Sequence, residues 1–210
     1  MERFDLITEA TARQIAAGST VELAEGGHVT PLAQDTLRAN RVTVLPAGSA
    51  SPAIVDLALV ADIRRIAIGS DHGGVALKAA LAEHLRKSAR QVTDLGTHDT
   101  EPVDYPDIAS RVARAVARGE ADAGIVIDGA GIGSAIAANK VKGIRAAMCL
   151  NQTLARYARQ HNGTNVLALG ATLVSVSEAI AIVDVWIATP MTEARYLRRL
   201  VKIRRLEESA

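Results

Sequence analysis

Residues 124–140 decide the fold, and their sequence is GIVIDGAGIGSAIAANK. An apolar run ends in Asp128, glycines follow at positions 129, 131 and 133, and a small-residue helical pattern comes next. A short apolar run bounded by glycine is typical of a buried β-strand. The stretch therefore predicts a strand, a glycine loop and a helix, with a carboxylate where the strand ends.

The same alternation recurs along the chain from Arg65 onward. Five short β-like runs are each followed by an amphipathic helical pattern: RIAIG, QVTDLG, GIVIDG, IRAAMCL and NVLALG. Such repeats predict an α/β fold with a doubly wound five-stranded parallel sheet, Rossmann-like in three layers, and a last helix near 192–206. Ser175 and Glu178 are spaced as a helix capping box, and Gly119 follows a helical run as a C-cap does.

The first 62 residues have a different pattern. We expect Thr8 to cap a short helix that ends near Gly18, and Thr30 with Pro31 to begin a second helix that ends near Asn40. RVTVL then predicts a strand, and PAGSASPA at 46–53 is typical of a linker. The sequence thus predicts a small N-terminal module with its linker, residues 1–62, and a main domain, residues 63–210.

Composition excludes several classes of function. Lys and Arg total 24 against 23 Asp and Glu, so a net charge of +1 gives no bulk attraction to nucleic acid or an anionic membrane. A single cysteine, Cys149, excludes an intramolecular disulfide framework and suggests a reducing compartment. No apolar run approaches the ~18 residues of a membrane span. We expect a soluble cytoplasmic protein with neither nucleic-acid nor membrane partners.

Two glycine loops should lie at the carboxyl ends of the strands, where open α/β sheets bind ligands. The first is GSDHGG at 69–74, where Asp71 and His72 either point into the crevice or, equally well, cap the helix and lie exposed. The second is DGAGIG at 128–133. Its spacing and its place after the third strand make it a weak dinucleotide signal, so we disfavour a nucleotide-binding function.

The second loop is a better candidate for an anion cradle. Successive backbone N–H groups in such a loop converge on developing negative charge. Asp128 beside it could act as a proton-transferring base, especially if burial raises its pKa towards neutrality. Taken alone, a carboxylate at this position is more often a cap of the loop or helix. Both roles remain open from the residues.

A third cluster lies towards the C-terminus. His161 and Asn162 precede the last strand, and Arg195 and Arg199 are four apart on one predicted helical face. Two such guanidinium groups are suited to bind one phosphate together. On its own, however, RYLRRLVKIRR is more often a solvated helix face.

Five motifs together resemble the ribose-5-phosphate isomerase B and galactose-6-phosphate isomerase family. They are IAIGSDHGG, VDYPDIA, GIVIDGAGIGSAIAANKVKGIRAA, ARQHNGTNVLALG and ARYLRRLVKI, in family order over residues 65–206. The resemblance implies an isomerase that interconverts aldose and ketose phosphates through an enediolate, with no metal or cofactor. It also implies a homodimer, or a higher homo-oligomer, whose subunits share active sites.

The resemblance assigns a role to each candidate residue. Those implied to hold the substrate phosphate are His72, Arg195 and Arg199. Those implied to line or bind the sugar are Asp71, Tyr105 and Asn162, with His161 assisting ring opening. The backbone implied to stabilise the enediolate oxygen belongs to Gly129, Gly131, Ile132 and Gly133.

Three positions depart from the family pattern. Many members carry a cysteine base at the position of Asp128 and a threonine at that of Ala130. Relatives often carry an arginine after LALG, where this chain has Ala171 and Thr172. The leading hypothesis is an isomerase of a phosphorylated sugar, most simply a pentose phosphate, with Asp128 as the base. The alternative is a non-catalytic phosphosugar-binding or assembly protein.

The N-terminal module carries a second resemblance. LITEATARQIAAGSTVELAEGGHVTPLAQDTLRANRVTVL, residues 6–45, is similar to the leading segment of the cobalamin adenosyltransferase of ethanolamine utilisation. It also resembles leaders of bacterial microcompartment enzymes, which implies a possible microcompartment shell or cargo partner. The alternative is a small module that packs on the main domain or widens the dimer interface.

Overall fold

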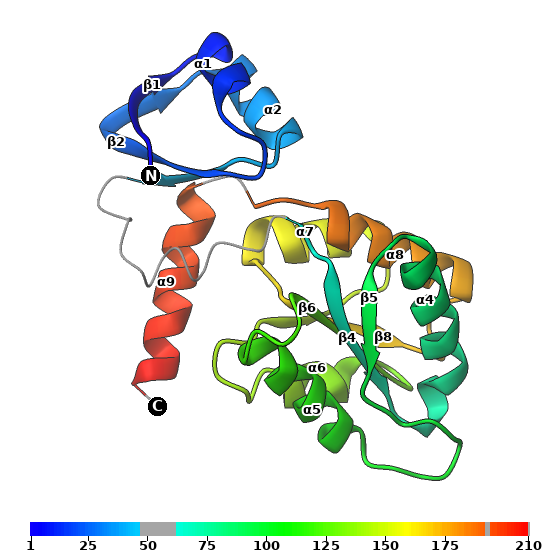
Figure 1. The fold of residues 1–210 in the computed structure, drawn as a ribbon. Coiled ribbons are helices and arrows are strands. Elements are labelled where there is room, and N and C mark those ends of the chain that lie inside the picture. The colour runs from blue at the N-terminus through cyan, green and yellow to red at the C-terminus, as the bar shows by residue number, and fades with distance from the viewer. Residues whose placement is uncertain (47–61, 192–193, 210) are drawn as a thin grey trace. The chain divides into compact units, whose positions relative to one another are not determined.

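A computed structural model describes residues 1–46, 62–191 and 194–209 (Figure 1). The chain divides into two compact units. We call residues 63–159 and 164–189 the core unit, and residues 1–62, 160–163 and 190–210 the module unit. Apart from Pro46, the predicted linker at 46–53 lies outside the described residues.

The core unit contains a five-stranded sheet, which confirms the predicted fold class. Its strands are β4 (Arg65–Ser70), β5 (Gln91–Asp94), β6 (Ala123–Asp128), β7 (Ala146–Met148) and β8 (Val166–Gly170). The order is β5-β4-β6-β8-β7, and every pairing is parallel. Strand β4 lies between β5 on one side and β6 on the other. The chain therefore reverses its winding direction at the carboxyl ends of β4 and β6.

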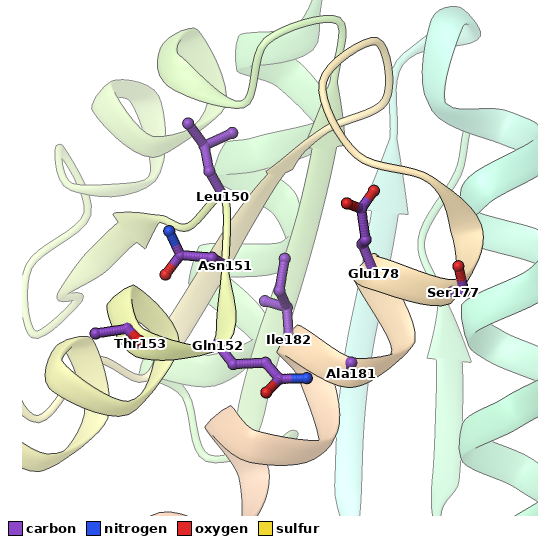
Figure 2. A pocket seen from close by; sticks show the side chains of 8 residues that line it. All are labelled: Leu150, Asn151, Gln152, Thr153, Ser177, Glu178, Ala181 and Ile182. Carbon is purple, nitrogen blue, oxygen red and sulfur yellow. The ribbon is translucent and has the colours of Figure 1, made fainter.

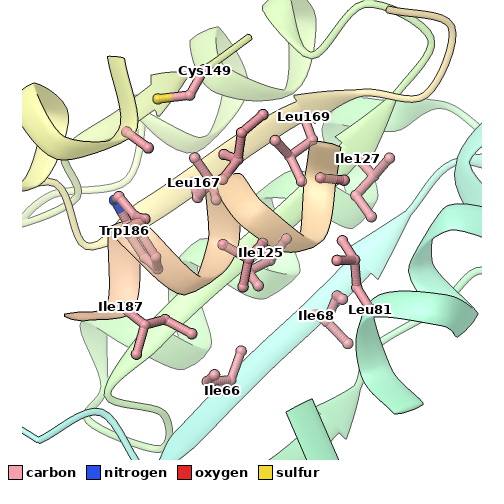
Figure 3. Close-up of a cluster of buried hydrophobic side chains, with 14 of the residues drawn as sticks. Ile66, Ile68, Leu81, Ile125, Ile127, Cys149, Leu167, Leu169, Trp186 and Ile187 are labelled. Atoms are coloured by element: carbon pink, nitrogen blue, oxygen red, sulfur yellow. The ribbon is translucent and has the colours of Figure 1, made fainter. Parts of the chain in front are cut away.

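Helices cover both faces of this sheet (Figure 1). The helices are α4 (Val75–Lys87), α5 (Tyr105–Ala117), α6 (Ile132–Ala138), α7 (Gln152–Asn162) and α8 (Val176–Ala188). Alternate strand residues face opposite sides. On β6, Ile125 and Ile127 pack in the cluster with α4 and α8, whereas Val126 packs in the cluster with α5 and α6. Figure 3 shows the first of these clusters, in which Trp186 is fully buried.

Local sequence signals are also confirmed. The Ser175 side chain accepts the Glu178 N–H and the Glu178 side chain accepts the Ser175 N–H, which completes the capping box at the start of α8. Gly119 follows α5 with φ of 70°, a left-handed conformation that glycine adopts without steric cost. These signals depend on neighbours in sequence, so they could be recognised without the tertiary structure.

The module unit has its own three-stranded parallel sheet. Its elements are β1 (Arg3–Ile7), α1 (Glu9–Gln14), β2 (Thr20–Val29), α2 (Pro31–Ala39) and β3 (Thr43–Pro46), with β2 in the centre of the sheet. Thr8 and Thr30 accept the backbone N–H groups of Thr11 and Ala33, which confirms both predicted N-caps. Ile7, Leu37 and Val44 belong to a buried core of this sheet and its two helices.

The last helix, α9 (Ala194–Glu208), also belongs to the module unit. In the predicted domain bounds, this helix lies within the main domain, residues 63–210. The structure packs it instead on β3, where Leu45 shares a buried cluster with Tyr196, Leu197 and Leu200. This long-range packing has no local signal in the sequence.

Candidate active site

The two glycine loops adjoin at the carboxyl ends of β4 and β6. Ser70 pairs with Ile127 across these strands, and the Asp71 N–H donates to the Ile127 carbonyl at 3.0 Å. Asp71 and Asp128 therefore follow neighbouring strands at the point where the winding direction reverses. Open α/β sheets bind their ligands at such points.

Asp71 caps the loop that it begins. Its Oδ1 accepts the N–H groups of Gly73 at 3.0 Å and Gly74 at 3.1 Å, at the start of the 3₁₀ turn η1 (His72–Gly74). A Cβ on Gly74 would lie 2.7 Å from a methyl of Ile127, so the turn packs closely on β6. Of the two roles that the sequence left open for Asp71, these hydrogen bonds show the capping role.

His72 is exposed beside this turn, and its ring is oriented by the backbone. Its Nδ1 accepts the Val103 N–H at 3.3 Å. This bond assigns the proton of the neutral ring to Nε2, because a neutral imidazole carries one donor and one acceptor. Nε2 of His72 can therefore donate to a ligand.

Tyr105 lies against the second loop. It is the first residue of α5, its side chain is 40% exposed, and a Cβ on Gly133 would lie 2.5 Å from its Cζ. Glycine at position 133 thus lets the phenol ring cover the start of α6. The structure brings Tyr105 together with the 128–133 loop, although the two are far apart in sequence.

The Asp128 carboxylate is folded back onto its own loop. Oδ1 accepts the N–H of Ala130 at 2.8 Å and that of Gly131, and Oδ2 accepts the N–H of Ser134 at 2.8 Å. The residue is only 4% exposed. These three amides surround the carboxylate, and it closes the turn between β6 and α6.

The pKa of Asp128 is lowered. Burial acts to raise this pKa, but the hydrogen bonds from the Ser134 side chain and from the backbone amides of Gly131, Ser134 and Ala130 together lower it further than burial raises it. Donors aimed at a carboxylate stabilise its charged form. The condition that burial raises the pKa of Asp128 towards neutrality is therefore not met, and Asp128 is ionised at neutral pH.

The predicted anion cradle is narrower than the sequence suggested. The Gly131 amide is directed at Asp128 and so is not available to a ligand. Within the described residues, the amides of Gly129, Ile132 and Gly133 have no protein acceptor. These three N–H groups are the part of the loop that can still meet an oxyanion.

Three residues that the sequence analysis missed hold this loop in place. Ser134 donates to Asp128 from its side chain and its backbone. Thr172 donates to the Gly129 carbonyl from its backbone N–H at 3.1 Å and from Oγ1 at 2.7 Å. A Cβ on Gly170 would lie 2.7 Å from the Ala130 carbonyl oxygen, so the loop rests on the end of β8. Serine at the third position of a helix that follows an aspartate was the one available signal.

A buried lysine fixes the neighbouring loop after β5. Lys78 is 2% exposed, and its Nζ lies 2.6 Å from both Asp94 Oδ1 and the Thr97 carbonyl oxygen. Thr97 in turn donates its N–H to the Ser70 carbonyl, next to Asp71. A lysine on the apolar face of a helix is a sequence signal that we overlooked.

The remaining candidate residues lie in the module unit. His161 and Asn162 end α7, and the His161 ring stacks on Tyr196 with centroids 4.5 Å apart. The guanidinium carbon of Arg199 lies 5.7 Å from the centroid of the same tyrosine ring. Arg195 begins α9, but its side chain lies outside the described part of the structure. The predicted site residues are thus divided between the two units.

The core unit has a pocket of about 430 Å³ between the starts of α7 and α8 (Figure 2). Its lining contains none of the predicted site residues: Leu150, Asn151, Gln152, Thr153, Ser177, Glu178, Ala181 and Ile182. Asn151 and Glu178 each take part in capping the helix that begins there. The Asn151 and Glu178 side chains in the pocket lining therefore already accept hydrogen bonds from helix backbone.

The described residues give little support for a reactive thiol, a metal site or a membrane span. Burial raises the pKa of the Cys149 thiol to about 11, so this cysteine stays protonated. No group of three or more His, Cys, Asp or Glu side chains within the described ranges is arranged to hold a metal ion. Among the helices that the structure describes, none is long and apolar enough to cross a membrane.

Comparison with known proteins identifies the family. Residues 66–203 match the family described as Ribose/Galactose Isomerase. Ribose-5-phosphate isomerase B of Escherichia coli (strain K12) is 44% identical over 146 residues, which cover 70% of this chain and 98% of that protein. The chain therefore belongs to the ribose/galactose isomerase family, as its motifs indicated.

Solved structures agree with this assignment. The ribose-5-phosphate isomerase B of Clostridium thermocellum is similar with a TM-score of 0.68 and 50% identity, over 69% of this chain and 97% of that one. The enzyme of the same name from Mycoplasma genitalium, solved with bound ribulose-5-phosphate, has a TM-score of 0.67 and 42% identity, over 69% and 97% of the two chains. The N-terminal resemblance to microcompartment leaders has no support in these comparisons.

Proposed function

We propose that this chain is a sugar-phosphate isomerase that interconverts an aldose and a ketose phosphate through an enediolate. Ribose 5-phosphate and ribulose 5-phosphate are the first substrates to test, since the relatives compared above are named for ribose 5-phosphate. One observation carries the proposal. The loops that begin at Asp71 and Asp128, together with His72 and Tyr105, lie at the carboxyl ends of β4 and β6, where the winding direction of the sheet reverses.

The substrate would be held by groups of known chemistry. His72 Nε2–H, Arg195 and Arg199 would bind the phosphate, because cationic and N–H donors form strong hydrogen bonds to phosphate oxygens. Asp71, Tyr105 and Asn162 would contact the sugar hydroxyls, and His161 would assist ring opening. The Gly129, Ile132 and Gly133 amides would donate to the enediolate oxygen, with Gly131 shaping the loop.

Asp128 would then move the proton. It would take the proton from the carbon next to the carbonyl and return it to the former carbonyl carbon, while a hydroxyl proton passes between the two oxygens. The carboxylate is ionised at neutral pH, as a base must be, but its pKa is lowered. Proton transfer is most efficient when the pKa of the base lies near the operating pH, so we expect slow turnover.

A second candidate function is binding of a phosphosugar without turnover. The observation that favours it is again Asp128, whose oxygens are engaged by Ala130, Gly131 and Ser134. A carboxylate held in this way caps the loop and need not meet the substrate. The phosphate-binding residues would be the same in both functions.

Deuterium exchange separates the two functions. The purified chain is incubated in deuterated water with sugar phosphates of four to six carbons, and NMR follows label incorporation and isomer formation. Label next to the carbonyl of one substrate establishes an isomerase and its sugar class together. Binding of a sugar phosphate with no label in any of them establishes the non-catalytic function. Arg199→Gln should weaken phosphate binding about tenfold or more in either case, because it removes a charge-assisted hydrogen bond.

We further propose the homodimer with shared active sites. Ile132 and Ile136 are 54% and 58% exposed one helical turn apart on α6, next to the candidate site. Adjacent exposed apolar side chains of this kind often mark a protein interface. Sedimentation of the purified chain tests this oligomer. Cytoplasmic location and a microcompartment partner for the module likewise remain proposals, and co-purification with shell proteins tests the partner.

A further inference from the structure

The C-terminal helix is packed on the N-terminal module. Leu45 of β3 is fully buried, and it shares a cluster with Met191, Tyr196, Leu197 and Leu200, which are each 5% exposed or less. Within the described residues, the buried part of α9 is thus its first two turns. The family match covers residues 66–203, so β3, the packing partner of α9, lies outside it.

Tyr196 connects that cluster to two candidate site residues, His161 and Arg199. Its ring is 5% exposed, stacks on His161 at 4.5 Å and lies 5.7 Å from the guanidinium carbon of Arg199. A stacked ring and a cation–π contact both depend on the position of the tyrosine. Any shift of the first turns of α9 would therefore displace Arg199 and disturb the stacking of Tyr196 on His161.

We propose that the N-terminal module is a positioning element for the substrate phosphate, acting through Leu45 and Tyr196. This inference rests on the proposed function in one respect, the role of Arg199. The module holds α9 in the place from which Arg199 meets the phosphate. Phosphate affinity is then set in part by residues 1–46, which contact no substrate themselves.

Two substitutions on one strand test the idea. Leu45 faces α9, whereas its neighbour Val44 belongs to the module's own core. Alternate residues of a strand point to opposite faces. Leu45→Ala and Val44→Ala in the full chain therefore both remove buried methyl groups from β3, but only the first removes them from the contact with α9.

The readouts are hydrogen exchange of residues 196–200 and the affinity for inorganic phosphate. In Leu45→Ala we expect exchange in α9 to rise at least about tenfold, since local opening becomes easier. Phosphate affinity should fall at least about fivefold, because a helix that repacks around the lost Leu45 side chain no longer holds Arg199 where its guanidinium forms charge-assisted hydrogen bonds to the phosphate. If turnover is found, KM should rise with kcat nearly unchanged. Val44→Ala should leave α9 exchange and phosphate affinity within about twofold of the unsubstituted chain.

Two results would overturn the inference. The first is unchanged α9 exchange in Leu45→Ala, which would mean that the module does not hold the helix. The second is faster α9 exchange with unchanged phosphate affinity. Arg199→Gln then identifies which step failed: if it also leaves phosphate affinity unchanged, the proposed role of Arg199 is wrong, and if it weakens binding, the positioning by the module is wrong.

Discussion

Replacing Asp128 by asparagine should destabilise the core unit, because the side chain closes the turn between β6 and α6. Asparagine keeps one carbonyl oxygen, which can still accept the N–H groups of Ala130 and Gly131. Its NH₂ group, however, would face the Ser134 amide, which donates to Asp128 Oδ2 at 2.8 Å. The buried Ser134 N–H then loses its acceptor, and the hydrogen bonds from Ala130 and Gly131 become neutral. The Ser134 hydroxyl can turn to accept from the new NH₂ group.

The expected cost follows from these bonds. A buried donor without a partner costs about 1–3 kcal/mol, and each hydrogen bond that loses its charged acceptor weakens by about 0.5–1 kcal/mol. We therefore expect Asp128→Asn to lower the free energy of unfolding by about 2–5 kcal/mol. Urea unfolding followed by the fluorescence of Trp186, the only tryptophan and fully buried in the core unit, reports this value.

An exposed aspartate provides the matched control. Asp107 lies in the first turn of α5, and Asp107→Asn makes the same chemical change at the surface. It should cost less than about 1 kcal/mol, the usual size of a helix-dipole effect. A loss within about 0.5 kcal/mol of zero for Asp128→Asn would refute the reasoning, since it would mean that the recorded bonds do not hold the loop.

The pH dependence has a definite sign. The folded state lowers the pKa of Asp128 from its ordinary value of 3.8, so the folded chain favours the ionised carboxylate. Its stabilisation is fully present above the unfolded pKa and is lost as the pH falls through the lower folded pKa. The difference in unfolding free energy between the unsubstituted chain and Asp128→Asn should be constant from neutral pH to about 5 and shrink below about 4. A difference that grows on acidification would contradict this.

Three further outcomes are expected. Gly131→Ala should cost at least about 2 kcal/mol by urea unfolding, since φ is 77° and the new Cβ would lie 2.8 Å from the Leu169 carbonyl carbon; a neutral effect would show that the loop can move away from β8. Lys78→Met should lower the free energy of unfolding by about 2–4 kcal/mol, since it leaves Asp94 without the ammonium group that lies 2.6 Å away. A variant more stable than the unsubstituted chain would show that apolar packing at this position outweighs the ion pair. Cys149 should not react with a thiol reagent at pH 8 until the chain unfolds, because it is 1% exposed and its pKa is raised to about 11; rapid reaction would reveal local opening near β7.

Sequence patterns predicted the core sheet because each of its signals is local. A strand such as β6 is apolar up to its final residue, Asp128, and the glycine loop and helix that follow it are adjacent in sequence. The capping box at Ser175 and the left-handed Gly119 likewise involve residues within one turn. Because right-handed crossovers place successive strands side by side, five repeats are enough to predict a parallel sheet.

The protonation and hydrogen bonding of the site were less predictable, because they depend on free-energy contributions that oppose one another. For Asp128, burial and hydrogen bonding shift the pKa in opposite directions, and the sequence does not show how many amides point at the carboxylate. In the sequence, Thr172 was notable only because relatives often carry an arginine near this position. The structure shows that its hydroxyl donates to the Gly129 carbonyl. The placement of α9 was missed for a different reason: Leu45 and Leu200 are far apart in sequence, and neither has a distinctive local pattern.

The packing of α9 has a practical consequence for protein production. Trimming the chain to residues 63–210, as the family match over 66–203 would suggest, would remove Leu45 and expose Tyr196, Leu197 and Leu200 to water. Newly exposed apolar side chains of this size promote aggregation. A shortened chain intended for crystallisation or assay would keep its isomerase-like sheet and lose the surface that keeps its final helix covered, so both ends should be retained or both removed together.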